Sequence, residues 1–296
     1  MMKNLFQAVC LALKQISVVY ALTLLTGCNN QTYTSPDGYD LSKPQLMNLG
    51  KVLNEISGLT YNNDNNTLLA ISDSKEKVYE INLERRKLKD YTERVVGTRT
   101  DLEDLVKVDS ILYLLGSRGI IYKVPLIKHV DTSVVKKFRF SSDEANDFES
   151  IYYDPSANGI VILCKTCASG EKEGVNNAYR FDLKTETFDE HPFYTISEKD
   201  IEALLKDDKV RFKPSAAAIN PVNKRLFILS SASNLLVICN IHGQPIEAYH
   251  LNPNNFPQAE GIAFAPNGDM YVSNEGKYSG RATLQVFPYQ QTGTKK

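Results

Sequence analysis

Three short segments each place a glutamate in an otherwise apolar run: Leu102-Glu103-Asp104-Leu105, Phe148-Glu149-Ser150-Ile151 and Ala259-Glu260-Gly261-Ile262. Two further segments carry a serine at the same point, Ile56-Ser57-Gly58-Leu59 and Pro214-Ser215-Ala216-Ala217. An ionised carboxylate near a hydrophobic core is costly unless another group compensates its charge. The recurrence therefore indicates that the five positions share one role.

The three glutamates would recur for a common reason if the fold brought their side chains together in one channel. Three carboxylates in one narrow channel repel one another, and without compensation at least one would hold a proton. A hard divalent cation removes that conflict, because calcium takes six to eight oxygen ligands from carboxylates, carbonyls, hydroxyls and waters. None of the five positions is a histidine, which favours calcium over zinc or copper.

The elements that must position these residues repeat along the chain. The second residues of the five segments, at 57, 103, 149, 215 and 260, are spaced by 46, 46, 66 and 45 residues. Each is followed by an apolar strand, a polar turn, a second strand, another turn and a third strand, and most units end on a charged fourth strand. Four strands in about 45 residues are typical of one propeller blade. The sequence therefore predicts an all-β, five-bladed β-propeller.

The two ends of the repeat array predict how the ring closes. The last unit ends after TLQVFPY at 283–289 and lacks an outer strand, while YDLSKPQLMNLGKV at 39–52 precedes the first unit. We expect this N-terminal strand to pair with the last blade. The long spacing of 66 residues indicates an insertion, and residues 197–208, with Ser197 as a cap, predict a short helix. Its apolar face would contain Ile201, Leu204 and Leu205.

In a propeller the first strand of each blade lines the central channel, and side-chain alternation would point the five positions at the axis. Glu55, two residues before Ser57, is then either an extra ligand or a rim residue. The alternative to a bound cation is that the three glutamates line a hydrated channel, or pair with Arg118 and Lys165 across it.

Residues at the ends of the second strands would face the mouth of the channel, where they could meet a small polar ligand or a peptide. They are Asp73, Arg118, Lys165, Ser230, Asn274 and Glu275. Most of these residue types are also those that ordinary turns favour, so the sequence leaves both interpretations open.

The segments ISGLTY, DLEDL, DFESIYYD, PSAAAI and PQAEGIAF, in this order and at these spacings, resemble the SdiA-regulated family over roughly residues 40–290. That family is similar to five-bladed propellers distantly related to NHL-repeat proteins and to calcium-dependent phosphotriesterase-like and lactonase-like propellers. A calcium ion has been associated with its fold. Carried over by position, the resemblance implies Glu103, Glu149 and Glu260 as calcium ligands, with Ser57 and Ser215 contributing directly or through water. The family name describes regulation and implies no biochemical activity.

Two functions fit these observations. One is a calcium-stabilised binding or scaffold module, whose ligand is a small molecule or an envelope protein. The alternative is a calcium-dependent hydrolase of lactones or phosphoesters, with one of the glutamates as general base. Related enzymes use Asn and Asp beside the metal and often a histidine, whereas the four histidines here are predicted in outer strands or turns: His129, His191, His242 and His250. The sequence therefore favours the binding module, and a monomer, because a five-bladed ring is a complete fold.

The N-terminal segment is typical of a bacterial export signal, because residues 1–27 carry Lys3, Lys14, an apolar run and no acidic residue. Its end, Leu24-Leu25-Thr26-Gly27-Cys28, resembles the lipobox of bacterial lipoproteins, which predicts lipidation of Cys28 and attachment to a lipid bilayer. An ordinary cleaved signal with a chance cysteine is the alternative. Asn29-Asn30 lacks the aspartate that retains some lipoproteins in the inner membrane, so we expect the outer membrane of a Gram-negative cell envelope.

The predicted organisation is then a signal peptide at 1–27, a lipidated cysteine and flexible tether at 28–39, the propeller at 40–290, and a disordered tail at 291–296. Removing residues 1–27 removes two lysines and no acid, which takes the formal charge from −1 to −3. Such a balance gives no sign of nucleic-acid binding.

The cysteines offer one more candidate. Cys164-Lys165-Thr166-Cys167 is predicted at the end of a strand and before a flexible loop. Catalytic C-x-x-C pairs lie at helix starts, so we expect a local disulfide or two free thiols here, rather than a redox site. Cys239 is predicted in a buried strand, which leaves no four-cysteine metal site.

Overall fold

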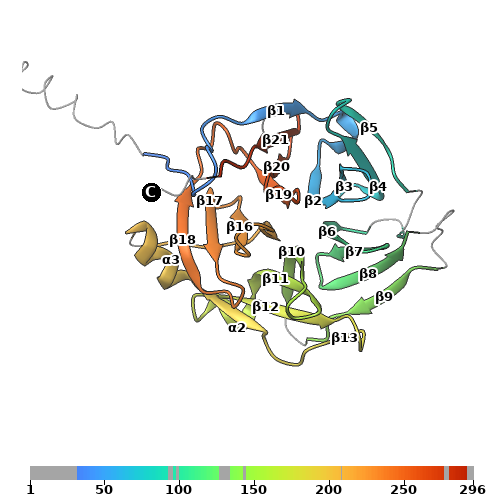
Figure 1. Cartoon of the computed structure of the whole chain (residues 1–296). Coiled ribbons are helices and arrows are strands. Elements are labelled where there is room, and N and C mark those ends of the chain that lie inside the picture. Colours follow the sequence, from blue (N-terminus) through green and yellow to red (C-terminus); the bar gives the residue numbers. More distant parts are fainter. Residues whose placement is uncertain are drawn as a thin grey trace, which may run out of the picture. The chain divides into compact units, whose positions relative to one another are not determined.

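The computed structural model describes residues 32–92, 96–97, 100–126, 134–142, 145–207, 209–276 and 280–291. From Tyr33 onward the chain is one compact unit. Five antiparallel sheets surround a central axis, each with its first strand innermost (Figure 1). The predicted all-β, five-bladed propeller is confirmed. No helix within the described ranges is long and apolar enough to cross a membrane.

The blades follow the order of the chain. Blade 1 consists of β2 (Ile56–Asn62), β3 (Thr67–Ser72), β4 (Lys75–Asn82) and β5 (Lys87–Asp90). Blade 2 consists of β6 (Leu102–Val108), β7 (Ile111–Gly116), β8 (Ile120–Pro125) and β9 (Lys136–Arg139). Blade 3 consists of β10 (Asn146–Asp154), β11 (Gly159–Cys167), β12 (Val175–Asp182), β13 (Thr187–Phe188) and β14 (Tyr194–Ser197). Blade 4 consists of β15 (Ala216–Ile219), β16 (Leu226–Ser230), β17 (Leu235–Cys239) and β18 (Pro245–His250).

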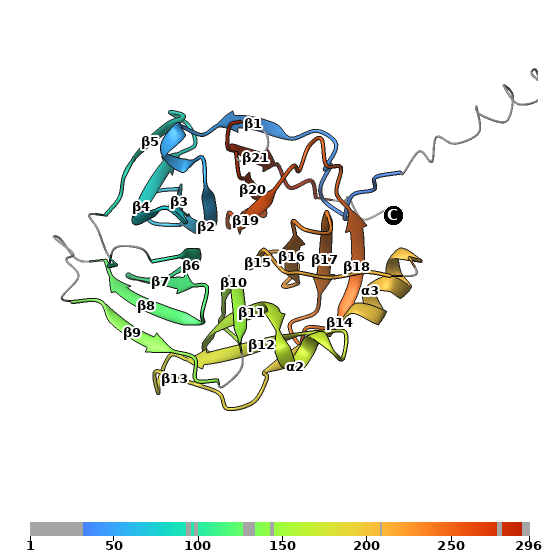
Figure 2. The same ribbon diagram turned by 180° about the vertical axis from the view of Figure 1, so that it is seen from behind.

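Blade 5 is built from both ends of the chain. It consists of β19 (Ala259–Phe264), β20 (Met270–Asn274), β21 (Thr283–Phe287) and, as its outer strand, β1 (Gln45–Asn48). β1 pairs antiparallel with β21, with Met47 opposite Leu284 (Figure 2). The predicted closure of the ring by an N-terminal strand is confirmed. A 3-10 helix, η1 (Lys51–Leu53), connects β1 to blade 1.

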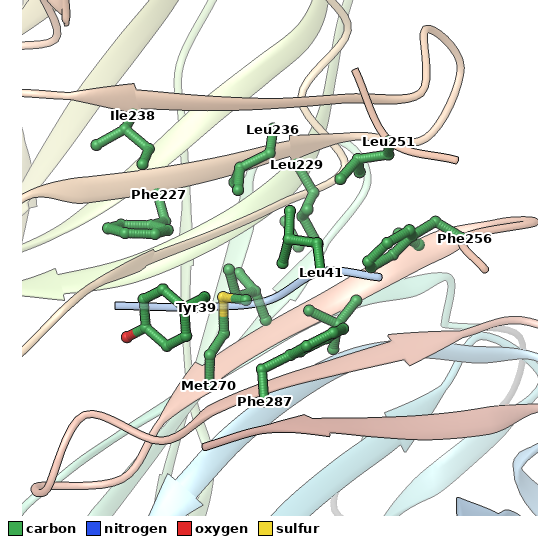
Figure 3. Close-up of a cluster of buried hydrophobic side chains, with 14 of the residues drawn as sticks. Tyr39, Leu41, Phe227, Leu229, Leu236, Ile238, Leu251, Phe256, Met270 and Phe287 are labelled. Atoms are coloured by element: carbon green, nitrogen blue, oxygen red, sulfur yellow. The ribbon is translucent and has the colours of Figure 1, made fainter. Parts of the chain in front are cut away.

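The core is divided among the blade interfaces, because each sheet buries both faces against its neighbours. Five apolar clusters fill the five gaps between consecutive blades. In the gap between blades 4 and 5, Tyr39 and Leu41 enter from the segment before β1 and pack beside Phe227 (Figure 3). The Tyr39 hydroxyl donates to the Gly268 carbonyl at 2.6 Å and accepts from the Asn220 amide at 2.7 Å.

Blade 3 carries the insertion. α3 (Glu198–Leu205) begins after Ser197, whose hydroxyl accepts from the Asp200 N–H at 3.3 Å, as a helix cap does. This confirms the predicted helix, although its buried face is narrower than expected: Ile201 is buried, whereas Leu204 is 39% exposed. The insertion also supplies β14, which pairs with β12 beside β13 and was not predicted.

The cysteine pair ends β11. Cys164 and Cys167 form a disulfide with their Cα atoms 5.8 Å apart, and Cys239 is a buried free thiol. The expected loop after the pair was wrong in one respect, because it opens with one helical turn, α2 (Ala168–Glu171). The disulfide fixes the two residues that lie between its cysteines, Lys165 and Thr166.

Candidate functional site

In four of the five blades, a β-bulge gives the inner strand one side chain that the strand register skips. In blade 4, Ser215 directly precedes β15, whose register is regular. In β2, Ile56 pairs with Ser72 and Gly58 with Ile71, which leaves Ser57 without a cross-strand partner. The register shifts in the same way around Glu103, Glu149 and Glu260. A bulge re-aims the extra side chain and bends the strand. These residues line the axial channel because of the bulge, whereas regular alternation directs their neighbours into the gaps between blades.

The four skipped side chains and Ser215 meet in a cavity of about 200 Å³ at the starts of the inner strands, which we call the acidic chamber. Seven carboxyl side chains line it: Glu55, Asp73, Asp101, Glu103, Glu149, Glu260 and Glu275. The remaining lining residues are Ile56, Ser57, Lys165, Ser215 and Gln258. All five positions singled out in the sequence therefore line one cavity, with Lys165 as the single cation among the described lining residues.

Lys165 pairs with one of the glutamates. Its ammonium donates to Glu149 Oε1, and the two side chains are 29% and 16% exposed. Burial lowers the pKa of Lys165, but the bond to Glu149 outweighs it and raises the pKa overall. Burial raises the pKa of Glu149, although Lys165 acts in the opposite direction. The structure thus contains one of the ion pairs weighed as an alternative to a cation.

The negative charges of the other two glutamates, Glu103 and Glu260, have no salt-bridge partner among the described residues. Burial raises the pKa of Glu103 to about 9, and Asp101, Glu149 and Asp147 add to the rise. Burial, together with Glu149, raises the pKa of Glu260 to about 7. At neutral pH Glu103 therefore holds a proton, as expected for carboxylates crowded into one channel.

The two serines join neighbouring blades. The Ser57 hydroxyl donates to the Leu102 carbonyl of blade 2 at 2.7 Å, and the Ser215 hydroxyl donates to the Ala259 carbonyl of blade 5 at 2.8 Å. Each acceptor directly precedes a chamber glutamate in the chain. The serines therefore fix the positions of Glu103 and Glu260 from the adjacent blade.

Asp104 is a buried structural residue beside the channel that sequence reasoning missed. It is 3% exposed, and its carboxylate accepts from the Ile151 N–H at 3.0 Å and from its own neighbour Leu105 at 2.8 Å. Leu59 N–H also bonds to it, and burial raises its pKa against these three donors. A Cβ on Gly58 would lie 2.7 Å from Asp104 Oδ1, so blade 1 needs glycine there. Asp104 thus connects the inner edges of blades 1, 2 and 3.

A sequence signal for Asp104 existed. The residue that follows the aligned serine or glutamate is small in every other blade: Gly58, Ser150, Ala216 and Gly261. An acidic residue in a column of small residues indicates a special contact close to the axis.

The residues predicted at the channel mouth divide into two groups. Asp73, Lys165 and Glu275 line the acidic chamber, and Glu275 accepts from the Gln258 side chain. Arg118, Ser230 and Asn274 do not belong to its lining. Arg118 is exposed, Ser230 is buried and accepts from the Lys213 N–H, and both polar side-chain atoms of Asn274 are buried without a hydrogen-bond partner among the described residues.

Residues 40–278 match the sequence profile of the SdiA-regulated family. The chain belongs to this family. The match covers blades 1 to 4 and the first two strands of blade 5, and it includes every skipped position. The sequence of this SdiA-regulated protein matches none of the curated proteins.

Solved structures similar to this SdiA-regulated chain share its fold. Glutaminyl cyclase from Myxococcus xanthus has 11% sequence identity and a TM-score of 0.54, over 83% of this chain and 95% of that one. A luciferin-regenerating enzyme has 12% identity and a TM-score of 0.51, over 84% and 96%. Calcium-binding regucalcin from Agrobacterium tumefaciens has 12% identity and a TM-score of 0.48, over 87% and 96%. At such identities the similarity shows the fold alone, and the regucalcin similarity carries no argument about calcium.

The side chains of the acidic chamber in this SdiA-regulated protein are of the types that bind a metal ion. In the described part of the chain they are not arranged as a preformed metal site. Its donors are carboxylate, hydroxyl and amide oxygens, which suit a hard cation. Across the described residues, however, no three acidic, histidine or cysteine side chains are gathered closely enough to hold a metal ion. A cation would have to draw the glutamates together and replace Lys165 beside Glu149.

The other end of the channel is different in character. A cavity of about 340 Å³ lies at the ends of the inner strands and is lined mainly by apolar residues such as Leu59, Ile151 and Phe264. Its lysine, Lys107, is 7% exposed and pairs with Asp64 at 3.0 Å. Of the two ends of the channel, the acidic chamber therefore has most of the charged side chains.

Proposed function

We propose that this SdiA-regulated protein is an envelope-anchored binding module whose acidic chamber holds a divalent cation, and calcium in particular. The charge of the chamber carries the proposal: seven carboxyl side chains and one lysine line about 200 Å³. Lys165 pairs directly with Glu149, while the pKa values of Glu103 and Glu260 rise to about 9 and about 7. A hard cation with oxygen ligands would stabilise the ionised forms of all three glutamates.

The ligands would come from the four skipped positions and Ser215. Glu103, Glu149 and Glu260 would supply carboxylate oxygens, and the hydroxyl oxygens of Ser57 and Ser215 keep a lone pair while donating to their carbonyls. The cation would order the chamber as a platform, at whose rim a small polar molecule or an envelope protein binds. The propeller would act as a monomer.

A hydrolase would need a group for proton transfer beside the cation. Three of the four histidines fall within the described ranges, and none of these lines the chamber. His191 and His242 are exposed, and His250 lies 3.1 Å from Asp207 at the edge of blade 4. His129 lies outside the described residues. Within the described residues a hydrolase would therefore have to use a chamber glutamate for proton transfer, and we favour the binding module because the histidine that related enzymes often use does not line the chamber.

Calorimetric titration of calcium into chelator-treated protein tests the proposal. We expect one saturable site per chain in residues 30–296, with affinity much reduced in Glu149→Gln. Glu84→Gln, in the exposed turn after β4, is the matched control and should bind like the parent chain. Absence of binding, with a melting temperature that calcium does not change, would exclude calcium and leave the glutamates as channel lining.

Anchoring through Cys28 is the second element of the proposal, and Cys28 lies outside the described residues. Ten residues separate it from Tyr39, whose ring is buried, and an extended chain of that length spans at most about 35 Å. An acylated Cys28 would therefore hold the propeller close to the outer membrane. Labelling of cells with a fatty-acid analogue should modify the full chain and not Cys28→Ser, and the variant should leave the membrane fraction. Equal fractionation of both chains would exclude the anchor.

A further inference from the structure

A second polar cavity adjoins the acidic chamber and was not anticipated in the sequence. It measures about 170 Å³ and lies between the end of β11, the start of β12, α3 and the segment 211–213 that leads into blade 4. The elements β12, β14 and α3 mark this sector of the ring in Figure 2. We call it the side pocket and define it by Lys165, Cys167, Asn176, Glu198, Arg211 and Lys213. Lys165 lines both cavities.

The charge of the side pocket is opposite to that of the chamber. Three cationic side chains line it, against the single carboxylate of Glu198, whose Oε1 already accepts from the Phe212 N–H at 2.8 Å. Lys165 has a salt-bridge partner in Glu149, whereas Arg211 and Lys213 have none among the described residues. The pocket therefore offers an anion two positive charges that have no salt bridge within the described ranges, although Lys213 also acts electrostatically on Asp147.

A buried acceptor lacks its donor in the same pocket. Asn176 is 7% exposed, and its side-chain amide nitrogen donates to the Cys164 carbonyl at 3.2 Å. Its carbonyl oxygen, Oδ1, is buried without a hydrogen-bond partner within the described part of the chain. Buried polar atoms are nearly always bonded to protein, water or ligand, so this acceptor, on a residue that lines the pocket, calls for a donor from a bound water or a ligand.

We infer that the side pocket binds a small 2-amino or 2-hydroxy carboxylic acid. Arg211 and Lys213 hold the carboxylate, because a guanidinium and an ammonium both donate charge-assisted hydrogen bonds to it. The amino or hydroxyl group on the adjacent carbon donates to Asn176 Oδ1. The second oxygen of Glu198, Oε2, is a further acceptor for an ammonium group. The chemistry of the pocket thus matches two neighbouring functional groups of one small molecule.

A set of three-carbon probes tests each part of this inference. L-alanine and L-lactate carry both functional groups, propionate lacks the 2-substituent, and ethylamine lacks the carboxylate. We expect alanine or lactate to bind at least tenfold more tightly than propionate in calorimetric or ligand-observed NMR titrations, and ethylamine not to bind. Propionate that binds as tightly as both alanine and lactate would overturn the role of Asn176, and no binding of any probe at millimolar concentration would overturn the site.

Variants assign the binding to the pocket. Lys213→Met and Arg211→Ala should each weaken binding of the preferred probe by tenfold or more. Lys199→Met, which removes an exposed charge from α3 outside the pocket, should leave affinity unchanged. Equal weakening in all three would show a general effect of net charge and overturn the site. All titrations contain chelator, so the result does not depend on whether the acidic chamber binds calcium.

Discussion

Glu149 and Lys165 are the two residues that the register between β10 and β11 leaves without a cross-strand partner, and their side chains form an ion pair. Asp147 pairs with Thr166 and Phe148 with Cys164, which skips Lys165 on β11. The next pair is Ser150 with Leu163, which skips Glu149 on β10. On β11, the disulfide between Cys164 and Cys167 closes a short loop that contains Lys165. The ammonium is therefore positioned by the sheet and by a covalent loop, as an internal counter-ion of the acidic chamber.

Removing this counter-ion should increase the affinity of the chamber for calcium. Lys165→Met keeps most of the side-chain volume and eliminates the ammonium that competes for Glu149. A partly buried pair of this kind contributes on the order of 1 kcal/mol, so we expect calcium affinity to rise about fivefold or more. Calorimetry compares the variant with the parent chain and with Lys199→Met. Affinity that falls in Lys165→Met would show that the lysine supports the cation site.

The hydrogen bonds that join blades through the serines should contribute to stability. Ser57→Ala and Ser215→Ala each leave a carbonyl at a blade interface without its donor, which should cost about 1–2 kcal/mol in the free energy of unfolding. The two sites join different pairs of blades, so their effects should add in the double variant. Urea unfolding followed by circular dichroism measures both, with the exposed Ser141→Ala as control. Loss of calcium binding without loss of stability would instead make the serines metal ligands.

Asp104 should be more important for stability than any chamber glutamate. Asp104→Asn replaces one carboxylate oxygen by an NH₂ group that cannot accept from Leu59, Leu105 or Ile151. We expect the free energy of unfolding to fall by about 2–3 kcal/mol, since buried backbone donors lose their acceptor. Hydrogen exchange should show faster opening at the Ile151 amide. A variant as stable as the parent chain would indicate that the aspartate is already protonated and weakly bonded.

The pH dependence of stability should report the crowding of carboxyl groups. The pKa of Glu103 rises from 4.5 to about 9 on folding, and that of Glu260 from 4.5 to about 7. Between these values the folded protein keeps protons that the unfolded chain has released, so stability should fall as the pH rises from 5 to 9. In chelator-treated Glu103→Gln the fall should be smaller by about 2 kcal/mol or more over this window. Thermal unfolding at several pH values measures both chains, and parallel curves would contradict the assignment.

Much of the fold could be predicted from the sequence, because each blade repeats one pattern. The spacing of the five segments defined the blades, and the missing outer strand of the last unit together with the spare N-terminal strand defined the closure. β14 could not be predicted, because its four residues gain their pairing with β12 only after the insertion folds back.

The sequence predicted which residues form the candidate site, but it did not predict how the strands turn them toward the axis. Repeated glutamates indicated convergence on the axis, and they do line one cavity with Ser57 and Ser215. Alternation alone did not predict that a bulge, rather than regular pleating, turns them to the axis. The side pocket combines Asn176 of blade 3 with Arg211 of the segment before blade 4. No local pattern connects residues so far apart in the sequence.

The bulges in the inner strands allow a channel-lining residue to vary without disturbing the packing of the core, two requirements that usually conflict in a small domain. Residues beside the skipped position, such as Ile56 and Leu59, belong to the apolar clusters between blades, while the skipped residue lines the chamber. A substitution there changes the charge or reach of an axial side chain without changing the volume of the core. In each of the four bulged blades one residue can therefore be exchanged, by mutation over generations or by an engineer, to give the same scaffold a new specificity.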